Sequence, residues 1–368
     1  MIKEIVSSLG DIIYLFIIAA AFIISCLLTP IMRRMAICIG AVDRPDGKRK
    51  LQSEPVPYFG GVAIVFGFII ASAAILFMPC GVPKTYPIIL IGTVLITLLG
   101  VIDDIADMRS YVKFLGQIII ALFTVSCGGA VEYISLFGRY IDLGVLSFPI
   151  TVIWIVLVIN SVNMIDGLDG LACGISSFSL MALLVSALIM GDPISAVLAG
   201  AMCGAALGFL PYNITPATIF MGDAGAMALG YVMACISVFG LLKGQAFFSI
   251  IVPALILALP VTDAVELFFE RISRGRNPFS ADRAHIHHCL IDMGLSPRGA
   301  VHVLYALSST FSISAIIYIK YKLFAIILAA STFLIMILIK LLPRSCDVSK
   351  IREFLTGLGK KKTHDKEN

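Results

Sequence analysis

Long apolar segments alternate with short polar segments along most of this 368-residue chain. A bilayer-spanning helix needs about 17–25 mostly apolar residues, and eleven runs reach or approach that length. They lie near 11–32, 60–79, 86–102, 112–128, 146–161, 171–190, 194–210, 225–242, 247–268, 301–319 and 323–342. Because backbone polar groups inside a bilayer must find partners within their own segment, each run predicts an α-helix. The predicted fold class is therefore an all-α polytopic integral membrane protein with about eleven transmembrane helices.

The composition supports this prediction and excludes a soluble domain of ordinary size. The chain is 59% hydrophobic and 14% charged, with a mean hydropathy of +1.01, whereas soluble domains are about 45–50% apolar and about 25% charged. Nine cysteines stand without a C-x-x-C pair, which argues against a disulfide framework. We predict one multi-span domain over residues 1–342, a basic tail over 343–368, membrane lipid as the surroundings and no nucleic-acid partner.

The distribution of Lys and Arg predicts the orientation in the membrane. The segments 33–58, 103–113, 161–170, 211–224, 269–300 and 343–368 carry 20 basic residues, and the connections on the other side carry 6. Cytoplasmic segments are enriched in Lys and Arg. We therefore expect the N-terminus outside, the C-terminus in the cytoplasm and these polar segments on the cytoplasmic face.

The stretch Asn160–Gly170 reads Asn-Ser-Val-Asn-Met-Ile-Asp-Gly-Leu-Asp-Gly and stands between two apolar runs. An acidic residue at bilayer depth costs about 2.5–3.5 kcal/mol on insertion scales, so Asp166 and Asp169 are expected to have a function or a partner. Glycine lets the backbone approach a ligand closely. A short polar loop with a glycine turn is the alternative explanation.

The other polar clusters fall on the same predicted face. They are Arg49-Lys50, Pro57-Tyr58-Phe59-Gly60-Gly61, Asp103-Asp104 with Asp107, Pro211-Tyr212-Asn213, Phe220-Met221-Gly222-Asp223, and Arg283 with His285, His287 and His288. A transporter would more often place such groups near the helix midplanes. Clustering on one face predicts a site open to cytosolic water.

These residue types suit phosphoryl transfer. Carboxylate and amide oxygens are the hard ligands that Mg²⁺ takes, usually one or two of them together with substrate phosphates. Such reactions need a metal ion and cationic groups to absorb developing charge, and Arg283 with the three histidines supplies donors for a pyrophosphate. Asp103 and Asp104 are adjacent and face different sides of a helix end, so one can face substrate while the other pairs.

Each cluster also has a simpler explanation. Two adjacent aspartates at a helix end are often a solvated terminus, and Gly60-Gly61 fits wherever two helices pack closely. The spacing of His285, His287 and His288 would also suit a zinc site. Asp263 and Glu266 could simply pair with Arg271 or Arg274.

Five stretches together resemble a known family. They are Asp43-Arg-Pro-Asp with Arg49-Lys50, Gly100-Val-Ile-Asp-Asp104, Asn163-Met-Ile-Asp-Gly-Leu-Asp-Gly170, Pro216-Ala-Thr-Ile-Phe-Met-Gly-Asp223 and Asn277-Pro-Phe-Ser-Ala-Asp-Arg-Ala-His-Ile-His-His288. In this order they resemble the polyprenyl-phosphate N-acetylhexosamine-1-phosphate transferases, glycosyltransferase family 4, over roughly 43–300. The His-Ile-His-His form is similar to the branch that begins enterobacterial common antigen, O-antigen and teichoic acid synthesis.

The resemblance implies a reaction in the bacterial cytoplasmic membrane. UDP-N-acetylglucosamine, or a related UDP-HexNAc, would give its sugar-1-phosphate to undecaprenyl phosphate and release UMP. It implies Mg²⁺, with Mn²⁺ as an alternative, and it suggests a homodimer. The implied roles are metal binding for Asp223 and Asn163, work on the lipid phosphate or its proton for Asp103 and Asp104, nucleotide binding for Lys50, Asp166, Asp169 and Asn213, and contact with the sugar and diphosphate for Arg283, His285, His287 and His288.

Three positions depart from the pattern of that branch. Gln52 stands where a histidine is usual, and Ala224 and Ala226 stand where hydroxyl residues are usual. Each lost hydrogen bond to phosphate or to the metal's surroundings would be worth roughly 0.5–1.5 kcal/mol, so we expect an altered substrate affinity or sugar choice. Two alternative functions stay open at this point: an enzyme acting on the muramoyl-pentapeptide nucleotide, and a transporter or lipid-binding protein without chemistry.

Overall fold

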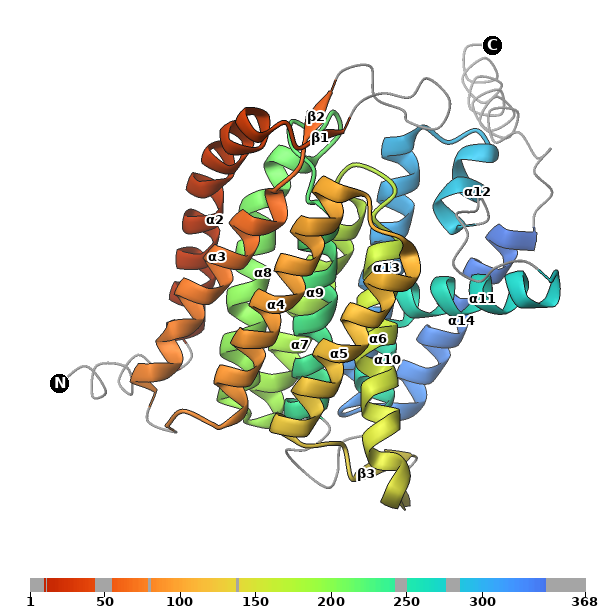
Figure 1. The fold of residues 1–368 in the computed structure, drawn as a ribbon. Coiled ribbons are helices and arrows are strands. Elements are labelled where there is room, and N and C mark those ends of the chain that lie inside the picture. The colour runs from red at the N-terminus through yellow and green to blue at the C-terminus, as the bar shows by residue number, and fades with distance from the viewer. Residues whose placement is uncertain are drawn as a thin grey trace, which may run out of the picture.

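The structure of this chain is a computed structural model that describes residues 10, 12–43, 55–78, 81–136, 139–241, 250–275 and 285–341. Within these residues, ten helical segments are long and apolar enough to cross a membrane. They are α2 (Ile12–Ile39), α3 (Gly60–Ser72) with the 3-10 turn η1 (Ala73–Phe77), α4 (Thr85–Ala106), α5 (Ser110–Gly128), η2 (Gly144–Leu146) with α6 (Ser147–Met164), α7 (Leu171–Met190), α8 (Pro193–Asn213), α9 (Gly222–Ile236) with the π turn η3 (Ser237–Leu241), α13 (Pro297–Tyr318) and α14 (Lys322–Leu341). Most of these helices run alongside one another in a bundle (Figure 1), which confirms a helical polytopic membrane protein.

The ninth predicted span, 247–268, is not one of these ten segments. Its described part forms the short helix α10 (Ile251–Ile256) and the first part of α11 (Ala258–Ser273). Figure 1 shows α11 lying across the direction of the other helices. The count of eleven spans, the external N-terminus and the cytoplasmic C-terminus therefore stay predictions.

Helix α9 is the centre of the bundle. Of its most apolar window, 89% of the residues are buried, the largest share among the ten segments, and it contacts α3, α4, α6, α7 and α8. Two glycines allow the closest approaches, because a Cβ at Gly61 would collide with the backbone of Gly225 and a Cβ at Gly100 with the backbone of Ala224. Small residues at helix contacts let membrane helices pack backbone to backbone. The Gly60-Gly61 pair thus serves helix packing.

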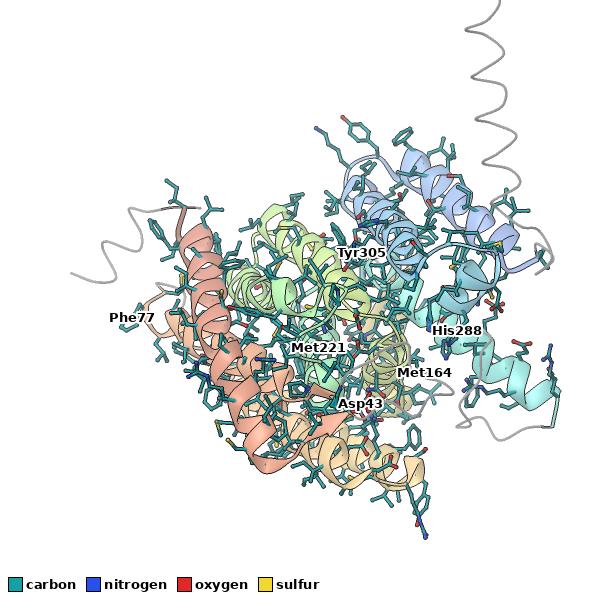
Figure 2. The ribbon with its side chains drawn as sticks, turned by 90° about the horizontal axis from the view of Figure 1, so that it is seen from above. Asp43, Phe77, Met164, Met221, His288 and Tyr305 are labelled. Carbon is teal, nitrogen blue, oxygen red and sulfur yellow. The ribbon has the colours of Figure 1, made fainter. Side chains whose placement is uncertain are left out.

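Two short antiparallel hairpins mark opposite ends of the bundle (Figure 1). β1 (Val42–Asp43) pairs with β2 (Val56–Pro57) at one end, and β3 (Tyr133–Leu136) pairs with β4 (Arg139–Asp142) at the other. The short helix α12 (Ile286–Asp292) lies toward the β1–β2 end. Seen from that end, Met221 is near the middle of the molecule, with Asp43, Met164 and His288 around it (Figure 2).

Several predicted loops are mostly helix ends. α2 continues past residue 33 to Ile39, and Asp103 and Asp104 lie inside α4. The backbone turns only where a residue adopts the left-handed conformation, at Gly40 (φ +82°) and Asp107 (φ +47°). Hydropathy locates the limit of the apolar run, whereas the helix ends where its hydrogen-bond ladder ends. The helices therefore run past the predicted apolar limits, and Asp103 and Asp104 lie in the last turn of α4, at the helix end where the sequence placed them.

Candidate active site

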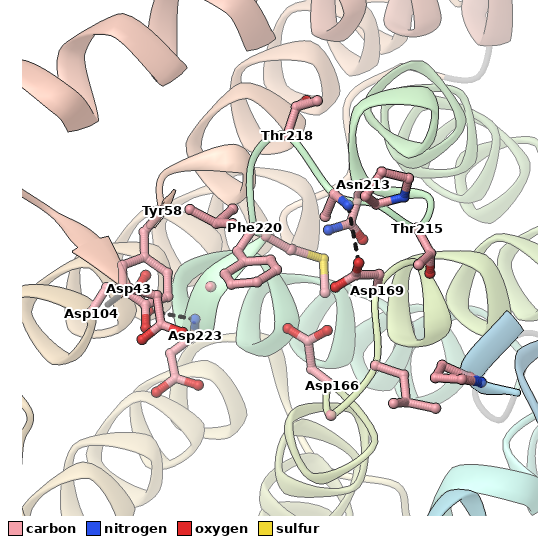
Figure 3. A pocket seen from close by; sticks show the side chains of 18 of the residues that line it. Asp43, Tyr58, Asp104, Asp166, Asp169, Asn213, Thr215, Thr218, Phe220 and Asp223 are labelled. Carbon is pink, nitrogen blue, oxygen red and sulfur yellow. Dashed lines mark hydrogen bonds between the residues drawn. The ribbon is translucent and has the colours of Figure 1, made fainter. Parts of the chain in front are cut away.

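A cavity of about 1070 Å³ opens at the β1–β2 end of the bundle. Its walls come from segments far apart in the chain, and Figure 3 shows several of their side chains pointing into it. The lining residues discussed below are Arg33, Asp43, Tyr58, Asp104, Asp166, Asp169, Asn213, Phe220, Asp223 and His288. This convergence confirms the expectation that the polar clusters meet at one end of the molecule.

Four side chains form the charged centre of the site. Lys113 Nζ, from the first turn of α5, donates to Asp223 Oδ2 at 2.6 Å and to Asn163 Oδ1 at 3.1 Å, and it lies 2.9 Å from Asp103 Oδ2. Asn163 Nδ2 also donates to Asp223 Oδ1. The Lys113 side chain is only 15% exposed. Three helices, α4, α6 and α9, thus present their oxygen atoms to one ammonium group from a fourth.

Asp103 and Asp104 make different contacts, as expected for adjacent residues that face different sides of a helix end. Asp103 accepts from the backbone N–H of Met108 and faces Lys113. Asp104 lines the cavity and accepts from the backbone N–H groups of Asp223 and Ala224, at 2.8 and 3.3 Å. A carboxylate at a helix N-terminus satisfies orphan donors and is favoured by the helix dipole. Asp104 therefore fixes the start of α9, where Asp223 stands.

The other two aspartates of the 160–170 stretch also line the cavity. Burial and the nearby carboxylates of Asp223 and Asp104 raise the pKa of Asp166 to about 8, with Lys113 opposing this shift. Asp169 Oδ2 accepts from the backbone N–H of Ala217 at 3.0 Å. The Asp166 carboxyl is thus poised between its charged and neutral forms near neutral pH.

Asn213 ties two walls of the cavity together. Its Oδ1 accepts from the backbone N–H of Gly170 at 3.1 Å, and its Nδ2 donates to the carbonyl of Ile219 at 3.2 Å. The connection between α8 and α9 is also held by Arg33, whose Nε donates to the carbonyl of Thr218 at 3.1 Å. The predicted nucleotide ligand Asn213 therefore also has a structural role.

The segment Pro57–Gly61 pairs with the segment just before α9 through backbone hydrogen bonds. Phe220 N–H donates to Pro57 O at 2.9 Å, Gly60 N–H to Phe220 O at 3.0 Å, and Gly61 N–H to Met221 O at 2.9 Å. Tyr58, which bonds Asp43, faces the cavity, and burial together with the charges of Asp43 and Asp104 raises the pKa of its hydroxyl. Tyr58 is therefore a neutral donor in the cavity wall.

The histidines lie on α12 and at its N-terminal boundary. His288 lines the cavity, while His285 and His287 are buried. The His285 and His287 rings stack, with centroids 5.4 Å apart, and the His287 and His288 rings meet at a tilt of 44° with centroids 4.3 Å apart. Burial, followed by the neighbouring histidines, lowers the pKa of His287 to about 3, so this ring is neutral. A Cβ at Gly167 would lie 2.8 Å from His287 Nε2, which explains the glycine there.

The expected pairing of Asp263 and Glu266 with arginines was wrong for the bonds that the structure defines. Asp263 binds His285 and Lys340, Glu266 binds Lys340, and Arg274 pairs with Glu270 instead. Lys340 comes from the last helix, α14, which packs beside α12. Asp263 is completely buried, and its cationic partner is Lys340, 77 residues further along the chain, rather than an arginine of the same helix.

The donor set fits a hard divalent cation. Asp223 offers a carboxylate that is 32% exposed and lines the cavity. Asn163 donates to this carboxylate through Nδ2 while its Oδ1 accepts from Lys113, so the amide would turn to give its oxygen to an ion held by Asp223. Among the described residues no group of three His, Cys, Asp or Glu side chains could hold a metal ion, so nothing supports the zinc alternative. Mg²⁺ commonly takes one or two protein carboxylates and completes its shell with water and phosphate, which matches Asp223 with Asn163.

Comparison with known proteins agrees with this geometry. Residues 86–241 match the family described as glycosyl transferase family 4. A Bacillus subtilis (strain 168) protein named "Probable undecaprenyl-phosphate N-acetylglucosaminyl 1-phosphate transferase" is 40% identical over 82% of this chain and 84% of its own length. This chain belongs to glycosyl transferase family 4.

Two further relatives are more distant. A "Decaprenyl-phosphate N-acetylglucosaminephosphotransferase" of Mycolicibacterium smegmatis is 33% identical over 77% of each chain. An "Undecaprenyl-phosphate alpha-N-acetylglucosaminyl 1-phosphate transferase" of Salmonella typhi is 29% identical over 81% of this chain and 80% of its own length. The family 4 match at 86–241 runs from α4 to the end of η3 and contains the whole Asp103–Lys113–Asn163–Asp223 cluster.

The structure shows where two of the departures in this family 4 chain lie. Ala224 and Ala226 are fully buried, and neither lines the cavity. Ala224 packs against the backbone of Gly100. The expected effect of these alanines on substrate affinity or sugar choice stays a prediction. Lys50, Gln52 and Arg283 lie outside the described residues.

Sequence reasoning missed two cations of the site. Arg33 and Lys113 were counted only as loop charges, yet Arg33 lines the cavity and Lys113 holds its carboxylates. A signal for Lys113 existed. It is followed by Gln117 at i+4 on an otherwise apolar helix, and a lysine on such a polar stripe needs an acidic partner.

Proposed function

We propose that this chain transfers N-acetylglucosamine-1-phosphate, or a related HexNAc-1-phosphate, from a UDP-sugar to undecaprenyl phosphate. An oxygen of the lipid phosphate attacks the sugar-linked phosphorus, the bond from that phosphorus to the bridging oxygen breaks, and UMP leaves. The product is a lipid-linked diphosphate sugar. We place the reaction at the cytoplasmic face of the bacterial inner membrane, as the first membrane step of cell-envelope polysaccharide synthesis. The names of the relatives support this substrate pair.

One observation carries the proposal: Lys113, Asp103, Asn163 and Asp223 meet at a single point beside a large cavity. Phosphoryl transfer between two anions needs positioning and charge neutralisation rather than covalent work by the protein. A cavity of about 1070 Å³ has the size of a site for a nucleotide sugar, since ligand sites commonly measure about 300–1,000 Å³.

Mg²⁺, with Mn²⁺ as an alternative, would be held by Asp223 and Asn163. When bound, the ion would neutralise phosphate oxygens. Lys113 supports the same task from the protein side, because its ammonium already faces Asp223 and Asp103 and can donate to a phosphate at that point. Asp104 keeps Asp223 in place by fixing the first turn of α9.

The two substrates would use different walls. We assign the lipid phosphate or its proton to Asp104, which lines the cavity, and the orientation of Lys113 to Asp103, which does not. Asp166, Asp169, Asn213 and Phe220 form the wall assigned to the nucleotide, and His288 contributes from α12. The roles of Lys50 and Arg283 at the nucleotide and diphosphate stay predictions.

UMP release by the purified protein tests the proposal. The protein is incubated with undecaprenyl phosphate and one UDP-sugar at a time, with Mg²⁺ or with EDTA, and Asp223→Asn serves as the inactive control. We expect UDP-N-acetylglucosamine or another UDP-HexNAc to release UMP only when both lipid and metal are present. Preference for the muramoyl-pentapeptide nucleotide, or absence of UMP with every donor, would reject the assignment.

A further inference from the structure

Asp263 of α11 is a completely buried carboxylate outside the cavity, at 0% exposure. Its Oδ2 lies 2.9 Å from His285 Nδ1, and its Oδ1 accepts from Ile286 N–H at 3.2 Å and lies 2.9 Å from Lys340 Nζ. A buried carboxylate is costly unless it is paired and hydrogen-bonded. This one is bonded by α12, by the residue before α12 and by the C-terminal helix α14.

The pairing determines which nitrogen of His285 carries a proton. A carboxylate beside an ammonium is ionised and can only accept hydrogen bonds. His285 must therefore hold a proton on Nδ1, and Nε2 is the nitrogen left for other partners. The His285 ring stacks on the His287 ring, and the His287 ring contacts, at a tilt of 44°, the ring of His288 that lines the cavity. A fixed His285 therefore constrains the ring against which His288 packs.

We propose that Asp263 is a positioning residue for the transfer reaction: it holds His285 as the Nδ1-protonated form and anchors α12, while Lys340 of α14 neutralises it. The inference rests on the proposed function, in which the histidines meet the sugar and diphosphate. It gives the last helix a part in the active site, although α14 contributes no residue to the cavity wall among the described residues.

The contacts predict what Asp263→Asn does. The amide oxygen keeps the two donors at the Oδ1 position, Ile286 N–H and Lys340 Nζ. The amide nitrogen then faces His285 Nδ1, and a donor there requires that Nδ1 lose its proton. The substitution therefore moves the His285 proton to Nε2 while the shape of the side chain is kept.

Nitrogen NMR of the full-length protein in lipid nanodiscs shows directly which ring nitrogen of His285 carries the proton. The protein is labelled with ¹⁵N-histidine, and the His285 signals are assigned by their loss in His285→Gln. We expect a protonated Nδ1 in the wild type and a protonated Nε2 with a bare Nδ1 in Asp263→Asn. This readout does not need turnover. It therefore tests the Asp263–His285 pair even if no UDP-sugar proves to be a donor, an outcome that would reject the proposed function alone.

Kinetics test the role in the reaction. We expect Asp263→Asn to lower kcat on the order of 10- to 100-fold, the range found when the partner that orients a metal-bound histidine is removed. The double variant Asp263→Asn/His285→Gln should be no slower than His285→Gln alone, because Asp263 acts through His285. Lys340→Met, which removes the positive charge, should lower kcat. Lys340→Arg, which keeps that charge, should have a kcat near the wild-type value.

Glu266→Gln is the matched control. Glu266 stands on the same helix and binds the same Lys340 at 2.7 Å, but its side chain is 51% exposed. We expect it to keep the wild-type kcat and the wild-type His285 signals. An unchanged His285 tautomer in Asp263→Asn, additive losses in the double variant, or an equal loss in Glu266→Gln would each overturn the inference.

Discussion

Replacing Lys113 by glutamine would test the charged centre of the site most directly. The substitution keeps a polar side chain of similar length but removes the ammonium that faces Asp103 at 2.9 Å and Asp223 at 2.6 Å. The two carboxylates would then stand close together without a cation. Both the stability of the protein and its turnover should fall.

The contacts set the size of the effect. Two unit charges about 4 Å apart attract by about 4 kcal/mol at an effective dielectric constant of 20, and Lys113 faces two such partners. Removing one member of a buried pair typically costs about 3–5 kcal/mol. Because the Asp223 side chain is 32% exposed, solvent weakens the effect, and we expect a loss near the lower end, about 3 kcal/mol. Turnover should fall by about 10²–10³, as when one preorganised donor to the developing charge is removed.

Thermal unfolding in detergent, with EDTA or with Mg²⁺, measures the stability, and UMP release measures turnover. Arg109→Gln is the control, because it removes one positive charge just before α5 at a side chain that donates to the Tyr111 hydroxyl rather than to a carboxylate. The melting temperature of Lys113→Gln should fall well below that of the control in EDTA. The gap should narrow with Mg²⁺, because a divalent ion at Asp223 supplies part of the missing charge. Equal melting temperatures in EDTA, or equal turnover, would refute this account of Lys113.

Four further outcomes are expected. Asp223→Asn should abolish Mn²⁺ binding in electron paramagnetic resonance titrations and lower UMP release by orders of magnitude, while the protein still inserts. Asp103→Asn should lower kcat with little change in the KM for the UDP-sugar, the pattern of an interaction made mainly in the transition state. Asp166→Asn should raise the melting temperature more at pH 8.5 than at pH 5.5. The reason is that the pKa of Asp166 is raised to about 8, so the folded protein binds more protons than the unfolded chain between about pH 4 and 8 and loses stability as the pH rises through that window. Cysteines placed at 84 and 360 should react with impermeant reagents from outside and from the cytoplasmic side, respectively.

A specific result would contradict each of these four predictions. Wild-type Mn²⁺ binding by Asp223→Asn would remove that residue from the metal site, and loss of UDP-sugar binding by Asp103→Asn would show that Asp103 acts in ground-state binding and not mainly in the transition state. A pH-independent gain in Asp166→Asn would mean that the pKa of the Asp166 carboxyl is not raised in the folded protein. Labelling of positions 84 and 360 from the same side would contradict the predicted orientation.

The helices were largely predictable because apolar length is a local property. The run at 171–190 coincides with α7, whereas the run at 11–32 falls short of α2, which continues to Ile39 through Arg33 and Arg34. Hydropathy could not show that both arginines lie on a helix end or that Arg33 lines a cavity. It also predicted one span at 247–268, where the described residues break into α10 and α11.

The site was predictable where residue type alone carries the chemistry. Asp104, Asp166, Asp169 and Asp223 were all expected at the site, and all line the cavity. Partners were not predictable, because Lys113 meets Asp223 across 110 residues and Asp263 meets Lys340 across 77. The packing of α9 against α4 and α6 brings Asp223 to its partners, whereas the position of α14 beside α12 brings Lys340 to Asp263.

The backbone pairing of Pro57–Gly61 with Phe220–Met221 has a consequence for inhibitor resistance. These three hydrogen bonds join main-chain atoms only, so substitutions at positions 57, 58 and 220 can change the side chains while the main-chain wall keeps its shape. Side chains such as Tyr58 can drift under selection, and a compound that depends on them can be evaded by a single codon change. A compound that instead contacts the main chain of Phe220 and Met221 in the cavity wall would meet atoms that side-chain substitutions do not replace.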